Sequence, residues 1–368
     1  MRGNDAASRL ADALRAARRP VFVAGRGSRG PGCRAALEGL AGRCGALLAT
    51  SAVAKGLFAG SEWSLDVSGG FASPLAAELI SGADLIVGWG CALNMWTMRH
   101  GRLIADDAVV VQVDLDADAL GTHRDLTFGV VGDVRATAET VAGQFGSEAA
   151  GYRTAQVRKA IRERIRWRDV PFPDLGGAGR IDPRSLTIAL DDLLPAERVV
   201  AVDSGNFMGY PSMFLDVPDE FGFCFTQAFQ SIGLGLSTAI GAALARPDRL
   251  PVAALGDGGA LMGASELETV VRLGLPMVVV VYDDAAYGAE VHHFGPQGLP
   301  LETVRFPETE FASIARGYGF EALTVRDVDD LAPVADWLDG PRDAPLLVDA
   351  KVVADEPSWW LEEAFRGH

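Results

Sequence analysis

Residues 252–290 constrain the fold of this chain more strongly than any other stretch. A short apolar run predicts a strand, and the turn Gly256-Asp257-Gly258-Gly259 ends it. A helical segment with its apolar residues on one side follows, and Gly274 ends that helix. The β-branched run at residues 277–282 then predicts a second buried strand, which ends at Asp283-Asp284. The stretch therefore predicts two parallel strands joined by a helix.

The two acidic turns are expected to meet at one edge of the sheet. A right-handed crossover places Asp257 and Asp284 side by side at the carboxyl ends of neighbouring strands, where open α/β sheets bind ligands. The adjacent glycines allow close backbone approach, and a helix starting near Ala260 points free N–H groups at the same place. This arrangement indicates a divalent cation, most simply Mg²⁺ holding a diphosphate. The alternative is a Gly- and Asp-rich turn without a ligand.

The same turns carry a family resemblance. Gly256-Asp257-Gly258 followed by Asp283-Asp284 resembles the thiamine diphosphate motif, which opens with G-D-G and closes with N-N. Residues 282–288, Tyr-Asp-Asp-Ala-Ala-Tyr-Gly, are similar to the acetolactate synthase (large subunit) branch of that family. The chain departs from the family because aspartates replace both asparagines, which adds negative charge beside a diphosphate.

The resemblance implies a set of ligands. The Asp257 and Asp284 side chains and the Ala286 carbonyl would bind Mg²⁺. Other cofactor contacts implied in this stretch are Gly256, Gly258, Gly259, Tyr287 and Gly288.

Two earlier segments extend the resemblance. Gly205 and Asn206 follow a predicted strand at residues 198–202 and would contact the phosphates, although an Asx turn explains the same residues. The Gln230 carbonyl would accept a hydrogen bond from the aminopyrimidine, and Ile232 would hold thiamine in its V shape. Without the family, Ile232 is an ordinary buried aliphatic residue.

Glu290 and His293 are the candidate catalytic residues. Several family members that release aldehydes from 2-oxo acids carry a glutamate at the position of Glu290, where it could protonate an intermediate or polarise an acceptor carbonyl. Either His292 or His293 could face the site. A polar helix face is the alternative for all three residues.

The first 150 residues contain a second glycine motif. Residues 25–30, Gly-Arg-Gly-Ser-Arg-Gly, follow a predicted strand and match G-x-G-x-x-G. The next strand, at residues 46–50, ends without the acidic residue that binds ribose hydroxyls, so we predict a structural turn rather than a dinucleotide site. Further predicted elements include a helix at residues 95–104.

The predicted fold class is α/β, with two three-layer domains built on mainly parallel sheets. Residues 1–150 form a Rossmann-like domain, which resembles the central domain of thiamine diphosphate decarboxylases and acetolactate synthases in motifs such as Ser68-Gly69-Gly70-Phe71. Some family members hold a structural FAD in that domain, but we do not expect FAD here. Residues 151–182 are a linker, and residues 183–368 form the domain that binds thiamine diphosphate and Mg²⁺.

The resemblance does not extend to the amino-terminal pyrimidine-binding domain of the family, which carries the glutamate that activates the cofactor. We therefore expect a split enzyme, in which a separate pyrimidine-domain subunit supplies that glutamate, in an α₂β₂ assembly. The implied activity is decarboxylation of pyruvate or a similar 2-oxo acid and transfer of the product to a carbonyl acceptor. A non-catalytic cofactor-binding or regulatory homologue is the alternative, and a nicotinamide-dependent dehydrogenase is a third possibility.

The composition of the chain limits the kinds of molecule that it is expected to bind. The formal net charge of −16 argues against binding to nucleic acid or to an anionic membrane surface. No apolar run approaches the length of a membrane span. The four cysteines lack metal-ligand spacing and are expected to be buried small residues in a reducing compartment, so we expect a cytoplasmic protein.

Overall fold

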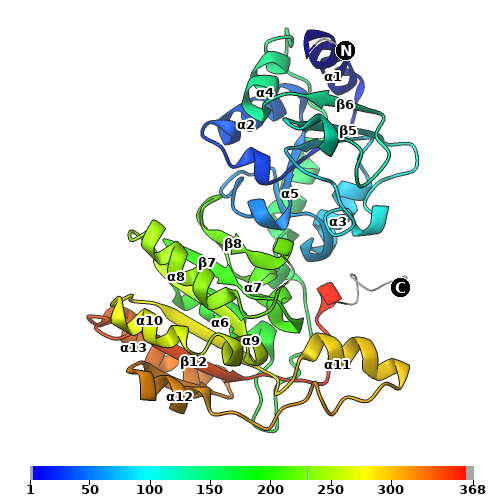
Figure 1. Cartoon of the computed structure of the whole chain (residues 1–368). Coiled ribbons are helices and arrows are strands. Elements are labelled where there is room, and N and C mark those ends of the chain that lie inside the picture. The colour runs from blue at the N-terminus through cyan, green and yellow to red at the C-terminus, as the bar shows by residue number, and fades with distance from the viewer. Residues whose placement is uncertain (1–2, 230, 362–368) are drawn as a thin grey trace. The chain divides into compact units, whose positions relative to one another are not determined.

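A computed structural model describes residues 3–229 and 231–361, which fall into two compact units (Figure 1). Unit 1 comprises the residues up to Val170 together with Asp219–Phe221, and unit 2 comprises Pro171–Pro218 and the residues from Gly222 onward. The segment 151–182 is therefore divided between the units. None of the helices described is both long enough and apolar enough to span a membrane.

The described residues of unit 1 contain one six-stranded sheet. Its strands lie in the order β3-β2-β1-β4-β5-β6, and every neighbouring pair is parallel. Its strands are β1 (Pro20–Ala24), β2 (Leu47–Thr50), β3 (Ser64–Val67), β4 (Leu85–Trp89), β5 (Val109–Asp114) and β6 (Phe128–Val131). The order reverses between β1 and β4, as in doubly wound folds.

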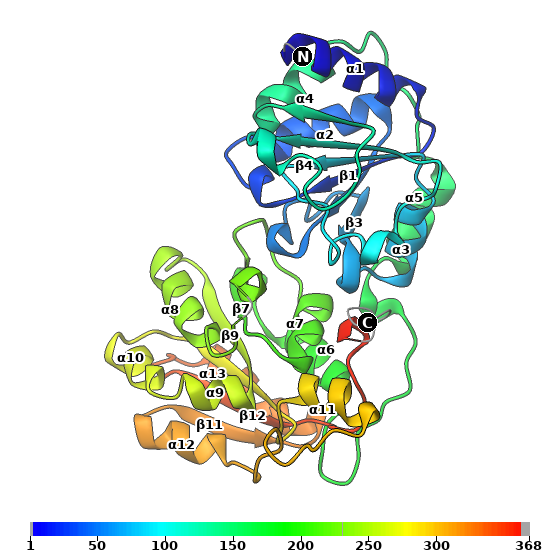
Figure 2. The same cartoon turned by 45° about the vertical axis from the view of Figure 1, so that its right-hand side comes forward.

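Helices cover both faces of this sheet (Figure 2). They are α1 (Gly3–Ala16), α2 (Cys33–Cys44), α3 (Pro74–Ser81), α4 (Val134–Ala142) and α5 (Ala155–Arg164). Alternate residues of each strand bury their side chains on opposite faces, because successive side chains of a strand point in opposite directions. Phe22 belongs to the core shared with α1, α2 and α4, whereas Val21 belongs to the core shared with α3 and α5.

The described residues of unit 2 also form a parallel six-stranded sheet, in the order β11-β12-β10-β9-β7-β8. Its strands are β7 (Arg198–Val202), β8 (Phe223–Phe225), β9 (Leu250–Gly256), β10 (Val278–Asp283), β11 (Glu321–Val325) and β12 (Leu346–Lys351). The central strands are buried along their length, which explains why they are almost continuously apolar.

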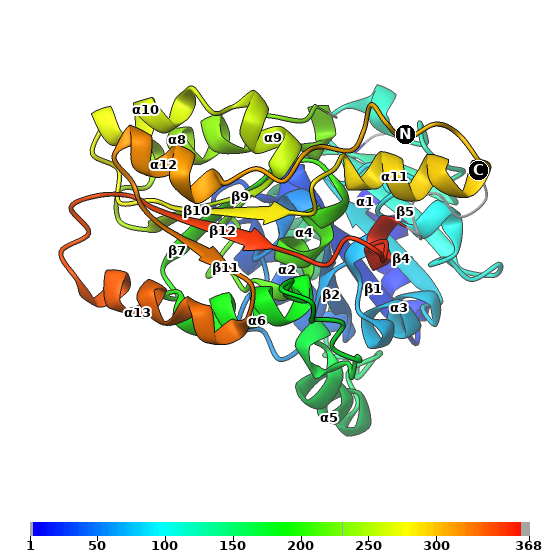
Figure 3. The same cartoon turned by 90° about the horizontal axis from the view of Figure 1, so that it is seen from below.

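Helices also flank this second sheet on two sides (Figure 3). They are α6 (Pro183–Leu193), α7 (Gly209–Phe214), α8 (Gly235–Ala245), α9 (Asp257–Met262), α10 (Glu266–Arg272), α11 (Gly288–Phe294), α12 (Phe311–Tyr318) and α13 (Ala332–Asp339). One face packs against α8, α10 and α12, and α6 and α13 lie on the other. The prediction of two three-layer α/β domains with parallel sheets is confirmed.

Two predicted helices are wrong in detail. Residues 95–104 form turns with a single short 3₁₀ segment, Arg99–Gly101, and Arg99 and His100 have left-handed backbones with φ of 45° and 55°. The Arg99 guanidinium donates to the carbonyls of Gly69 and Ala72, both at 2.8 Å, so tertiary contacts fix this turn. The helix expected after the first acidic turn divides into α9 and α10, and it begins at Asp257 rather than near Ala260.

Other predictions fall at the ends of the chain or on single residues. The sequence of residues 358–366 predicts a helix, which is described only as far as Leu361, and the remainder lies outside the described residues. Cys33, Cys44 and Cys91 are buried, and Cys224 is partly exposed. Burial raises the pKa of the Cys44 thiol to about 12 and that of Cys91 to about 11, as expected for structural cysteines.

The glycines of the G-x-G-x-x-G motif pack against the chain itself. The Gly25 N–H donates to the Trp89 carbonyl at 2.9 Å, and the Gly27 N–H donates to the Gly90 carbonyl at 3.0 Å. A Cβ on Gly25 would lie 2.3 Å from the Gly90 oxygen, and one on Gly27 would lie 2.9 Å from the Gly90 Cα. The contact between the ends of β1 and β4 therefore accounts for these two glycines.

We predict that Gly25→Ala lowers the free energy of unfolding by about 1–3 kcal/mol, because its Cβ has no room beside Gly90. Chemical denaturation measures this loss. Gly30→Ala is the matched control from the same motif, since its Cβ would meet only the Cys33 sulfur at 3.6 Å. Equal stability of the two variants would contradict the packing explanation.

Candidate functional site

The ends of β9 and β10 bring the two predicted carboxylates together. These strands pair in parallel with Gly256 opposite Tyr282, so Asp257 and Asp284 both lie just beyond the carboxyl edge. The Asp257 carboxylate accepts one hydrogen bond from the Gly258 N–H at 2.8 Å and another from the Ala286 N–H at 3.0 Å. The second bond ties the first acidic turn directly to the second.

The turn after β10 has a strained backbone that several hydrogen bonds hold. Ala285 adopts φ of 57°, a left-handed conformation that non-glycine residues rarely adopt. The Asp283 carboxylate accepts from the Ala285 N–H at 3.0 Å, and the Phe306 N–H donates to the Ala285 carbonyl at 2.8 Å. Asp283 is thus a structural residue of this turn.

Burial and mutual repulsion dominate the electrostatics of the pair. Asp257 is 3% exposed, and burial followed by the charges of Asp284 and Asp283 raises its pKa. Burial and the charge of Asp283 also raise the pKa of Asp284, and the charge of the Arg180 guanidinium opposes this increase. Within residues 3–229 and 231–361, neither Asp257 nor Asp284 forms an ion pair with a basic side chain. A divalent cation would supply the positive charge that this pair lacks.

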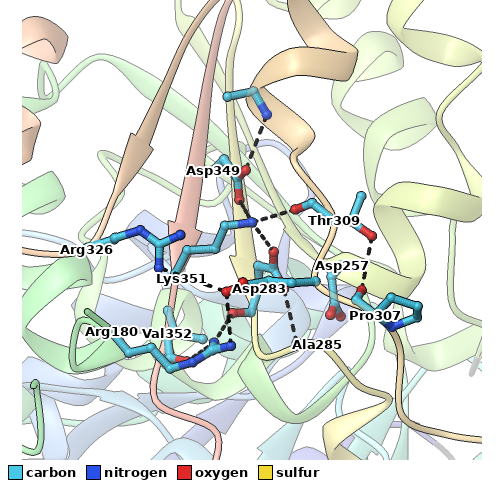
Figure 4. Close-up of polar contacts among 12 residues, drawn as sticks. Arg180, Asp257, Asp283, Ala285, Pro307, Thr309, Arg326, Asp349, Lys351 and Val352 are labelled. Carbon is cyan, nitrogen blue, oxygen red and sulfur yellow. Dashed lines mark hydrogen bonds and ion pairs between the residues drawn. The ribbon is translucent and has the colours of Figure 1, made fainter. Parts of the chain in front are cut away.

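Asp283, in contrast, has a buried counter-charge (Figure 4). Its carboxylate lies 2.6 Å from the Lys351 ammonium, which also lies 3.1 Å from the Asp349 carboxylate and donates to the Thr309 carbonyl. The three charged side chains are at most 1% exposed. Burial alone would lower the pKa of Lys351, but hydrogen bonding to Asp283 and the two carboxylate charges raise it. Asp349 also accepts from the Ala312 N–H at 3.3 Å.

Lys351 and Asp349 were not predicted as site residues, although the sequence contains a signal for them. Strand β12, Leu-Leu-Val-Asp-Ala-Lys, is buried throughout, and these two charged residues occupy alternate positions of it. Charged residues are almost never fully buried unless they are paired. Two opposite charges on one face of a buried strand therefore indicate a buried network, but the partner strand cannot be identified from the sequence.

Two glycines bring the backbone close to the acidic turns. A Cβ on Gly288 would lie 2.2 Å from a carboxylate oxygen of Asp284, and one on Gly258 would lie 2.3 Å from the Tyr287 ring. The Tyr287 ring also packs edge-on against Phe306 at 4.7 Å. Predicted cofactor residues 258, 284, 287 and 288 therefore come together at one place.

Asp203 is a further buried carboxylate that sequence analysis did not single out. It accepts from the Gly233 N–H at 2.9 Å and is 1% exposed. A Cβ on Gly259 would meet an Asp203 oxygen at 2.4 Å and a methyl of Ile232 at 3.4 Å, so Ile232 lies beside the glycine turn. Gln230 lies outside the described residues. The role predicted for Ile232 stays a prediction.

The turn after β7 is fixed by the segment near the end of the described chain. Gly205 has φ of 144°, which favours glycine, and buried Asn206 accepts from the Ser358 N–H at 3.0 Å through its side-chain oxygen. The Trp360 indole donates to the Asn206 carbonyl at 2.8 Å. Phe207 stacks on Tyr282 with ring centroids 5.3 Å apart, which packs this turn against the end of β10.

Glu290 and His293 lie on α11, which begins at Gly288 beside the acidic turns. Both side chains are partly exposed. The alternative histidine, His292, lies against the segment that contains Ala354 and Glu356, and burial lowers its pKa while these two neighbours oppose that shift. The catalytic roles of Glu290 and His293 stay predictions.

The sequence profiles of two known domains match the two units. Residues 7–141 match the thiamine pyrophosphate enzyme central domain, and residues 203–350 match the thiamine pyrophosphate enzyme C-terminal TPP-binding domain. The chain therefore belongs to the thiamine pyrophosphate enzyme family, and the resemblance stated from the sequence is confirmed.

The chain is similar to several curated members of this family. It is 26% identical over 353 residues to a sulfoacetaldehyde acetyltransferase of Alcaligenes xylosoxydans, covering 87% of this chain and 58% of that protein. It is 26% identical over 349 residues to an acetolactate synthase large subunit of Parasynechococcus marenigrum, covering 93% and 55%. It is 29% identical over 337 residues to a probable 2-ketoarginine decarboxylase of Pseudomonas aeruginosa, covering 89% and 57%. The chain spans little more than half the length of these relatives.

Buried Asp257 predicts a pH dependence of stability in the presence of a metal chelator. Because the pKa of Asp257 is raised on folding, the native state binds more protons than the unfolded state above pH ~4, the ordinary aspartate value. The free energy of unfolding should therefore fall as the pH rises, and this fall should be smaller in Asp257→Asn.

Chemical denaturation at several pH values between 5 and 8 measures how steeply the free energy of unfolding changes with pH in the wild type and in Asp257→Asn. Asp248→Asn is the control, because Arg246 lowers the pKa of that exposed carboxyl to about 2 and it stays ionised across this range. Identical slopes for Asp257→Asn and the wild type would show that Asp257 is not protonated on folding.

Proposed function

We propose that this chain is one subunit of a split thiamine diphosphate-dependent 2-oxo acid decarboxylase or carboligase similar to acetolactate synthase. It would act on pyruvate or a similar acid and a carbonyl acceptor, and a second polypeptide would supply the pyrimidine-binding domain with its activating glutamate. The observation that carries the proposal is the pair formed by the buried Asp257 and the partly buried Asp284, at the carboxyl edge of a sheet within the residues matched by the TPP-binding domain.

The donor set suits Mg²⁺. Asp257, Asp284 and the Ala286 carbonyl would supply hard oxygen ligands, which Mg²⁺ prefers together with phosphate oxygens and waters. Among the described residues, no group of three His, Cys, Asp or Glu side chains could hold a metal ion. The remaining coordination positions would thus be filled by the backbone carbonyl, the diphosphate and water. Gly258 and Gly288 provide the close backbone approach.

The other residues of the unit would position the cofactor and the substrate. Bound thiamine diphosphate would supply the carbanion chemistry by which a 2-oxo acid loses CO₂. Gly205 and Asn206 would bind the phosphates, and Ile232 would support the thiamine from the side of the glycine turn. Glu290, in the first turn of α11, would donate a proton or polarise the acceptor carbonyl, with His293 one turn further along.

An exposed apolar surface supports a protein partner for unit 2. Phe229 is 77% exposed, and Met262 and Leu261, at the end of α9, are 56% and 42% exposed. Met262 packs against Gly233, close to Ile232. Apolar side chains exposed beside a cofactor site are typical of a surface that another domain covers. We propose that the pyrimidine-binding subunit covers it, in an α₂β₂ assembly.

A non-catalytic homologue that binds the cofactor or a partner is the second candidate function. The aspartate at position 284 favours it, because it adds a negative charge beside a diphosphate, whereas the charge of Asp283 is paired with Lys351. Partner-dependent CO₂ release separates the two candidates.

The deciding experiment is native mass spectrometry of the protein purified from its own cells in Mg²⁺, followed by CO₂-release assays with pyruvate and 2-ketoarginine, and by an acetyltransferase assay with sulfoacetaldehyde. A complex with a second chain and thiamine diphosphate, active on one of these compounds, supports the split enzyme. A complex that binds the cofactor but releases no product supports the regulatory homologue. A homo-oligomer unable to bind added cofactor contradicts both.

We predict that Gly288→Ala weakens Mg²⁺-dependent binding of thiamine diphosphate by about 10-fold or more, because the new Cβ displaces the Asp284 carboxylate. Isothermal titration calorimetry at several Mg²⁺ concentrations measures this change. Gly295→Ala, on the residue that follows α11, is the control, since its Cβ would meet only the Leu301 side chain at 3.4 Å. Unchanged binding by Gly288→Ala would exclude Asp284 as a ligand.

We predict that Glu290→Gln lowers kcat by roughly 10²–10⁴-fold while cofactor affinity stays the same, because proton transfer is lost but the ligands remain. Steady-state kinetics with the partner present and calorimetry separate the two effects. A matching loss of cofactor affinity would place Glu290 in cofactor binding instead.

A further inference from the structure

The buried charges behind the acidic turn explain how this chain tolerates an aspartate at position 283. Asp283 is the last residue of β10 and pairs in register with Lys351, the last residue of β12. Their side chains lie on the same face, and the ammonium is 2.6 Å from the carboxylate (Figure 4). The ammonium also lies 3.1 Å from the Asp349 carboxylate and donates to the Thr309 carbonyl. The ammonium thus donates hydrogen bonds to Asp283 and Thr309, and Asp349 adds a second negative charge at ion-pair distance.

Asp283 uses its two carboxylate oxygens for different partners. One oxygen binds Lys351, and the other accepts from the Ala285 N–H at 3.0 Å. Ala285 is the left-handed residue between Asp284 and Ala286, so the second contact fixes the turn that carries both. The ion pair therefore determines the orientation of the side chain that holds this turn.

From this geometry we propose that Lys351 is a positioning residue of the cation site. It neutralises Asp283 and orients its carboxylate, so that the turn presents Asp284 and the Ala286 carbonyl without a second uncompensated charge beside the diphosphate. The identity of the bound ligand in this inference rests on the proposed function. The role of Lys351 in orienting the turn rests on the structure alone.

The pairing makes the identities of residues 283 and 351 interdependent. An asparagine at position 283 could still accept from the Ala285 N–H, but its amide N–H₂ would then face the Lys351 ammonium, and two donors would meet. A neutral residue at position 351 would leave the Asp283 charge buried without its partner, which is strongly unfavourable. Changing both residues removes both conflicts at the turn, because the new amide at position 283 would face a neutral side chain. Asp349 loses its buried counter-charge in Lys351→Met and in the double variant alike, so both are expected to lose stability. The comparison of these two variants therefore reports on the turn, which is expected to be disturbed in the single variants and restored in the double variant.

Hydrogen exchange of the full-length chain tests the positioning without any ligand. In Lys351→Met we expect the amides of residues 284–287 to exchange about 10-fold faster than in the wild type. Asp283→Asn combined with Lys351→Met should return exchange to near the wild-type rate. The proposal is overturned if residues 284–287 exchange at the wild-type rate in Lys351→Met. It is also overturned if they exchange as fast in the double variant as in Lys351→Met. If Lys351→Met does not fold, Asp283→Asn and the double variant provide the same comparison.

Titration of Mg²⁺ at a fixed concentration of thiamine diphosphate tests the link to the ligand. Each single variant should need about 10-fold to 100-fold more Mg²⁺ for half-maximal binding, as for residues that support metal ligands, and the double variant should recover most of this loss. Loss of stability in Lys351→Met with an unchanged Mg²⁺ requirement would overturn the proposal, because the lysine would then be only structural.

Lys55→Met is the matched control. Lys55 is a buried lysine of unit 1, 3% exposed and 3.0 Å from Asp66. Its loss should lower stability without changing either the Mg²⁺ requirement or exchange in residues 284–287. If the wild-type chain binds no thiamine diphosphate even in complex with its partner subunit, the proposed function fails, and the exchange data alone still decide the role of Lys351.

Discussion

The parallel pairing of β9 with β10 is the constraint on which the rest of unit 2 depends. It fixes Gly256 opposite Tyr282, so the two acidic turns begin at the same edge with no freedom to slide along one another. A one-residue slip would turn every side chain of a strand to the other face. The buried apolar residues of these strands oppose such a slip, and the hydrogen bond from Ala286 to Asp257 joins the turns beyond the strand ends.

The sequence predicts this part of the protein well because its signals are local. A short apolar strand, a glycine turn and a β-branched strand each reflect contacts between near neighbours in the chain. The handedness of a crossover then places Asp257 and Asp284 together without further information. Fold class and the position of the candidate site follow from these rules.

The parts that the sequence did not predict depend on distant partners. The left-handed turn at Arg99 is held by carbonyls of Gly69 and Ala72, and Lys351 is held by Asp283 from another strand. Neither partner is marked by local spacing. The same holds for Asn206, whose side chain accepts from a residue 152 positions away. A polar turn predicts that Asn206 forms a hydrogen bond but not with which group.

The contacts of Asn206 have a consequence for synthesis of the protein. The Gly205–Asn206 turn is completed by the Ser358 N–H and the Trp360 indole, which are made after almost all of the described part of unit 2. Chains fold from the amino terminus as they emerge, and contacts of large sequence separation form late. A nascent chain would thus hold a nearly complete sheet while the Gly205–Asn206 turn still lacks these two hydrogen bonds. The turn can close only after residue 360 has been made, so the order of synthesis makes its closure a late step in the folding of this unit.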